Sequence, residues 1–67
     1  MMELYFENSK NERRIIGYPK TENEAYEIIE KFCKDRNFRI YYIRSWLNES
    51  KEKVFDVGSH TEFFYLV

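Results

Sequence analysis

One amphipathic helix, set between segments that are typical of β-strands, constrains the fold of this sequence most strongly. The helix is expected to begin in the run TENE, where Thr21 can accept from the backbone N–H of Glu24 and the Glu24 side chain can reach back to the N–H of Thr21. Asn37 tolerates the left-handed conformation and is a suitable end. The apolar positions between them recur at helical spacing and form one stripe: Ala25, Ile28, Ile29, Phe32 and Cys33. A helix of this kind can cover one face of a sheet.

Five segments outside the helix have the alternation or the aromatic and β-branched content of strands. They lie at residues 2–8, 13–19, 38–47, 53–57 and 62–67. The expected fold class is therefore α+β in the order ββαβββ, a mostly antiparallel five-stranded sheet with one helix packed on one face. Residues 1–67 are expected to form a single domain. The strand orders 2-1-3-4-5 and 2-1-5-4-3 both fit these connections.

Large side chains occur on both faces of the expected strands, although one helix covers only one face. In the segment 38–47, Phe38, Ile40, Tyr42 and Trp46 fall on one face, and Tyr41, Ile43 and Leu47 fall on the other. The sequence therefore predicts an uncovered sheet face rich in tyrosine, which is a candidate contact surface. Four side chains of this segment are candidate binding residues: Tyr41, Trp46, Arg39 and Arg44.

The stretch DVGSHTEFF contains the only histidine, His60, close to Asp56 and Glu62. A carboxylate beside an imidazole could orient it as a general base. The same stretch also has the features of a tight turn, because Ser59 and Glu62 have capping-box spacing and can bond each other's backbone N–H groups. Gly58 would supply a positive φ there. The turn accounts for Gly58, Ser59 and Glu62 but leaves His60 and the exposed part of Ser59 as candidate contacts.

Composition and charge disfavour several classes of function. The chain has 67 residues, a formal net charge of -1 and 19% aromatic residues. A clustered excess of Lys and Arg is lacking, which disfavours nucleic acid as the main partner. One His and one Cys, Cys33, are too few for an ordinary zinc site, so no metal and no cofactor are expected. Without a signal-like or membrane-spanning apolar segment, a cytoplasmic location is expected.

The segments LYFEN, KFCKDRNFRIYYIRSW and DVGSHTEFF resemble small proteins carried by phages and integrated mobile elements of Gram-positive bacteria. The likeness extends over nearly the whole chain, and the ending DVGSHTEFF is its most specific part. No activity is assigned to that group. The resemblance therefore implies a setting, an accessory gene product acting in the host cytosol, and no mechanism.

Together these observations predict a small non-catalytic binding module. It would engage a protein partner, or itself, through the open sheet face and the loop at residues 58–62. Binding of single-stranded nucleic acid by stacking on the same rings is the alternative. An enzyme that depends on His60 is a second and weaker alternative, because a small sheet offers little concave volume for a substrate.

Overall fold

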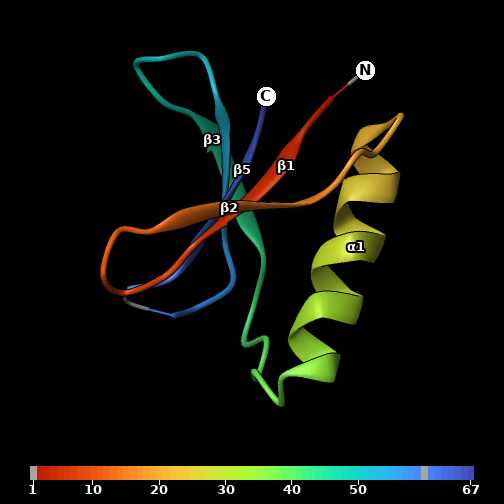
Figure 1. Cartoon of the computed structure of the whole chain (residues 1–67), viewed down its shortest axis with the longest axis vertical. Coiled ribbons are helices and arrows are strands. Elements are labelled where there is room, and N and C mark those ends of the chain that lie inside the picture. The colour runs from red at the N-terminus through yellow and green to blue at the C-terminus, as the bar shows by residue number, and fades with distance from the viewer. Residues whose placement is uncertain (1, 60) are drawn as a thin grey trace.

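The computed structural model describes residues 2–59 and 61–67. It contains one helix and a five-stranded sheet in the order β2-β1-β5-β4-β3, with every pairing antiparallel (Figure 1). The elements are β1 (Leu4–Glu7), β2 (Arg13–Gly17), α1 (Glu22–Asp35), β3 (Arg44–Leu47), β4 (Lys53–Asp56) and β5 (Phe63–Leu66). The predicted α+β class is confirmed, and of the two strand orders left open the second is correct.

Helix α1 begins where the capping signal predicts. Thr21 is the N-cap in an extended conformation, and its Oγ1 accepts from the N–H of Glu24 at 3.2 Å. The reciprocal bond is not the one predicted, because the Glu24 carboxylate accepts from the N–H of Lys20 at 3.1 Å instead of from Thr21. The carboxylate thus holds the backbone at Lys20, directly after the buried Pro19.

Within residues 2–59 and 61–67, α1 lacks the length and apolar character needed to cross a bilayer.

The helix ends in a Schellman motif, as the asparagine predicts. Asn37 has a φ of 57° and donates its N–H to the carbonyl of Lys34 at 3.2 Å. The N–H of Phe38 bonds the carbonyl of Cys33 at 2.8 Å. Both bonds satisfy carbonyls that the last helical turn would leave unpaired, and they turn the chain sharply away from α1.

The hydrophobic core lies between α1 and one face of the sheet. Alternation places Leu4 and Phe6 of β1, Phe64 and Leu66 of β5, and Phe55 of β4 on that face, where all are buried. The helix contributes the buried members of its predicted stripe: Ala25, Ile29 and Cys33. Burial also raises the pKa of the Cys33 thiol, as expected for an inert core cysteine.

The third strand is shorter than the sequence predicts. Residues 38–47 have strand composition throughout, yet β3 comprises only Arg44–Leu47. Its partner β4 ends at Asp56, and beyond it a single bond continues the pairing, from the N–H of Tyr41 to the carbonyl of Val57 at 3.1 Å. Because residues 38–43 lack a regular ladder, strict alternation is lost, and Ile40 and Ile43 both pack against the core.

The two hairpin loops have the same geometry, a feature that was not predicted. In each five-residue loop an asparagine comes first and a glutamate last: Asn8 with Glu12, and Asn48 with Glu52. In both, the asparagine amide donates to the glutamate carboxylate and its Oδ1 accepts the glutamate N–H. The fourth loop residue has a φ of 62° in each case. The signal was present in the sequence as NSKNE and NESKE.

Candidate protein-interaction surface

Exposed aromatic side chains gather on one edge of the sheet. Eight large apolar side chains are exposed among the described residues, and five of them lie in the segment 38–47. We call these five the aromatic strip: Phe38, Tyr41, Tyr42, Trp46 and Leu47. Tyr41 and Leu47 are the most open, at 67% and 69% exposed. The strip includes the predicted binding residues Tyr41 and Trp46, and it lies on the edge strand β3 and the segment leading into it.

The two candidate arginines flank rings of this strip. The Arg39 guanidinium lies 5.7 Å from the Tyr41 ring centroid, and that of Arg44 lies 5.0 Å from Tyr42. Arg44 also donates from Nη2 to Oδ2 of Asp56 at 3.0 Å, and this hydrogen bond raises the pKa of Arg44. Arg44 is therefore held in place by its own chain, whereas Arg39 contributes an exposed positive charge beside the strip.

The predicted turn after β4 is present. Gly58 has a φ of 94°, and its N–H bonds Oδ1 of Asp56 at 2.9 Å. Ser59 Oγ accepts the N–H of Glu62 at 3.2 Å, as the capping spacing predicts. The return bond differs from the prediction, because Ser59 Oγ donates to the Glu62 carboxylate, which also accepts from the hydroxyl of Thr61 at 3.1 Å. The carboxylate is thus occupied by hydroxyl groups instead of the Ser59 N–H.

This turn adjoins the aromatic strip. A Cβ built on Gly58 would lie 2.8 Å from the Cβ of Tyr41, so the glycine allows the two backbones to approach closely. A small cavity of about 20 Å³ is bordered by Phe38 on the strip side and by Ser59 and Glu62 on the turn side. The turn and the strip, which are separate in sequence, are therefore adjacent at Tyr41 and Phe38.

The centre of the open sheet face is less exposed than the sequence predicts. One row of side chains crosses all five strands on that face: Ile15, Tyr5, Tyr65, Val54 and Trp46. Only the ends of the row are exposed, Ile15 at 37% and Trp46 at 44%, while Val54 is 4% exposed. The open face therefore carries the predicted tyrosines, Tyr5 and Tyr65, but both are half-buried, and its exposed aromatic side chain lies at the edge.

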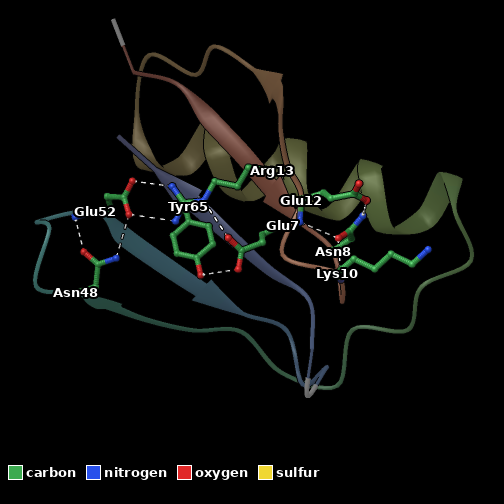
Figure 2. Close-up of polar contacts among 8 residues, drawn as sticks. All are labelled: Glu7, Asn8, Lys10, Glu12, Arg13, Asn48, Glu52 and Tyr65. Atoms are coloured by element: carbon green, nitrogen blue, oxygen red, sulfur yellow. Dashed lines mark hydrogen bonds and ion pairs between the residues drawn. The ribbon is translucent and has the colours of Figure 1, made fainter.

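Arg13 covers part of this face (Figure 2). Its Cζ lies 3.8 Å from the centroid of the Tyr65 ring, and its Nη1 donates to Glu52 at 2.9 Å. Its Nε donates to Glu7 at 3.1 Å, and the Tyr65 hydroxyl donates to the other oxygen of Glu7 at 3.4 Å. β1 and β5 lie between β2 and β4, so the Arg13 side chain reaches across two strands to meet Glu52. Nothing local in the sequence predicts this contact, which joins residues 39 positions apart.

The ion pair at Glu52 predicts an acid-sensitive contribution to stability. Hydrogen bonds from Arg13 and Asn48 lower the pKa of Glu52 below its ordinary value of 4.5. A carboxyl group whose folded pKa is depressed stabilises the fold above its unfolded pKa, and the effect is lost as pH falls through the folded value. Glu52→Gln should therefore reduce the drop in urea midpoint between pH 7 and pH 3. Glu49→Gln, at the exposed tip of the same loop, is the control; equal drops in wild type and Glu52→Gln would contradict the assignment.

A shallow groove of about 940 Å³ lies between α1 and the segment leading into β3. Its lining combines apolar residues (Cys33, Phe38, Ile40 and Ile43) with charged residues of the helix (Glu27, Glu30, Lys31, Lys34 and Asp35). The groove exists because α1 does not extend over β3, where Leu47 stays exposed. It borders the aromatic strip at Phe38.

His60 lies outside the described residues, so the catalytic hypothesis and the contact role predicted for this side chain stay predictions. Both carboxylates proposed to orient it have other partners: Asp56 bonds Arg44 and Gly58, and Glu62 bonds Ser59. In residues 2–59 and 61–67, no three His, Cys, Asp or Glu side chains come together as metal ligands.

Comparison with known proteins adds no relative. No protein-family model, curated protein or solved structure matches this chain.

Proposed function

We propose that this protein is a non-catalytic binding module that engages a protein partner, or a second copy of itself, through the aromatic strip and the adjoining turn at residues 58–62. The observation that carries the proposal is the gathering of exposed rings at one edge of the sheet. The resemblance to phage and mobile-element proteins suggests the host cytosol as the setting. There the module would act as an accessory protein that binds a host or phage component.

The composition of the strip supports a protein partner. Interfaces are enriched in Tyr, Trp, Phe and Arg and depleted in other charged residues at their centres. The strip supplies Phe38, Tyr41, Tyr42 and Trp46, with Arg39 beside them. Aromatic side chains of this kind provide most of the binding energy when a partner buries them.

Single-stranded nucleic acid is the second candidate, because Arg39 lies over the exposed ring of Tyr41, an arrangement suited to base stacking. The formal net charge of -1 and the pairing of Arg44 with Asp56 weigh against it. Titration with mixed oligonucleotides, followed by Trp46 fluorescence, separates the two functions. Stacking with phosphate contact must weaken steeply as salt rises, and no binding at about 50 mM salt would remove this candidate.

Trp46→Ala should weaken partner capture if the strip is the interface. Truncating a central interface aromatic costs about 2 kcal/mol, or roughly thirtyfold in affinity. The measurement is affinity capture from a Gram-positive host lysate, followed by titration of the captured protein. Tyr18→Ala is the matched control, because Tyr18 is 57% exposed but lies between β2 and α1, away from the strip. Equal capture by wild type, Trp46→Ala and Tyr18→Ala would count against the proposal.

A further inference from the structure

The outer side of β3 presents unpaired backbone groups. β3 is the last strand of the sheet, with only β4 beside it. The N–H of Asn48 bonds the carbonyl of Glu52 at 3.0 Å and thereby fixes the alternation of the ladder. Residues 44, 46 and 48 direct their backbone groups toward β4, so the N–H and C=O groups of Ser45 and Leu47 point away from the sheet. An exposed row of this kind is a template for another extended strand.

The two edges of the sheet differ in how well they are protected. On β2, Arg14 places a charge on the edge, whereas Arg13 is paired with Glu7 and Glu52, and the pairing with β1 shifts register between Leu4 and Tyr5. Charges and irregularities of this kind discourage pairing with other chains. β3 has a regular register and one charged residue, Arg44, which is bonded to Asp56. It is therefore the unguarded edge.

We infer that β3 pairs with β3 of a second copy of this chain, antiparallel about a two-fold axis. This inference rests on the proposed function, since it names the partner of the same strip. In the register that places Ser45 opposite Leu47 of the second copy, every outward N–H and C=O of these two residues finds a partner. A register shifted by two residues would have to use Ile43 in one direction or Glu49 in the other, and both lie outside the regular strand.

The side chains of β3 suit this two-fold arrangement. In this register Trp46 lies on the axis and faces its counterpart in a close, non-hydrogen-bonded pair, where aromatic side chains interact well. On the opposite face, Leu47 of each copy lies across from Ser45 of the other. Because the strands are antiparallel, Arg44 of each copy comes opposite Asn48 and beside Glu49 of the other. β2 carries Arg13 and Arg14 and no carboxylate, so β3 of the second copy is the better match for Arg44.

Sedimentation equilibrium of wild type and two Ser45 variants tests the inference. Ser45→Pro removes an outward N–H and leaves the bonds to β4 intact, because proline is tolerated where an edge N–H faces solvent. Ser45→Thr keeps the N–H and is the matched control. Wild type and Ser45→Thr should form dimers, and Ser45→Pro should raise the dissociation constant by at least roughly tenfold.

Several outcomes would overturn the inference. One is a wild-type protein that stays monomeric at up to about 1 mM. Another is a Ser45→Pro dimer as tight as that of wild type. A third is a series of oligomers that grow without limit, which would indicate head-to-tail pairing of β2 with β3. If Ser45→Pro does not fold, amide exchange of wild type still decides: Ser45 and Leu47 should become protected as concentration rises, and fast exchange at every concentration would refute the pairing. If the protein is a monomer but still captures a partner through Trp46, only the dimer is refuted. If it is a monomer and captures nothing, the proposed function is refuted as well.

Discussion

Phe64→Ala is expected to leave most of the protein unfolded at 25 °C. Phe64 is 1% exposed on the central strand β5, and its ring contacts those of Phe6 and Phe32 at centroid distances of 5.3 and 5.6 Å. Removing a buried phenylalanine costs about 3–5 kcal/mol. A domain of this size rarely has more than about 3–5 kcal/mol in total. Urea unfolding followed by circular dichroism measures the loss.

Phe63→Ala is the matched control for this prediction. Phe63 is the adjacent residue with the same side chain, but it lies on the opposite face of β5 and is only half-buried. We expect a loss of about 1 kcal/mol. Similar losses for the two variants would mean that the core is not where the burial pattern places it.

Gly58→Ala is expected to destabilise the fold by about 2 kcal/mol or more. A φ of 94° is costly for any residue with a Cβ, and the added methyl group would lie 2.8 Å from the Cβ of Tyr41. The segment that carries the aromatic strip would have to move, so partner binding should fall as well. Urea midpoints and capture assays measure the two effects separately.

Gly17→Ala is the control, and a Tyr41→Gly background separates the two causes. At Gly17 the added Cβ would meet only the Ile28 side chain, with the flexible Cδ1 nearest at 2.9 Å and Cγ2 at 3.3 Å, so stability should stay within about 1 kcal/mol of wild type. In the Tyr41→Gly background the contact is relieved but the strained φ remains, so Gly58→Ala should cost less than in wild type. If Gly58→Ala in the wild-type background destabilised the protein as little as Gly17→Ala does, the predicted strain at Gly58 would be refuted.

Local signals predicted most of the fold. The start of α1 at Thr21, its end at Asn37 and the buried face of β1 each depend on neighbours within a few residues, which a sequence displays directly. The length of β3 was not predictable in this way. Residues 38–43 have strand composition, but a strand continues only while a partner lies beside it, and β4 ends before the Gly58 turn.

The candidate surface was predicted only in part, because some of its features depend on contacts between strands that are distant in the sequence. Tyr41 and Trp46 were identified as candidates, but the partial burial of the tyrosines at the centre of the open face was not foreseen. Arg13 covers the Tyr65 ring by reaching Glu52, and such a contact depends on how strands far apart in the sequence are ordered in the sheet. Periodicity assigns side chains to a face but does not show which long side chains from distant strands lie across it.

The central position of β5 has a consequence during synthesis. Both hairpins precede β5 in the chain, yet β5 lies between them and joins β1 to β4 (Figure 1). Hairpins form within about 1–10 μs, whereas a ribosome adds about 5–20 residues per second. On the nascent chain the hairpin of β1 and β2 can therefore form repeatedly before β5 has been made, while the inner edge of β1 is still bare. Until β5 is available, that edge is the site at which a chaperone would protect the chain, or at which neighbouring chains would misassemble.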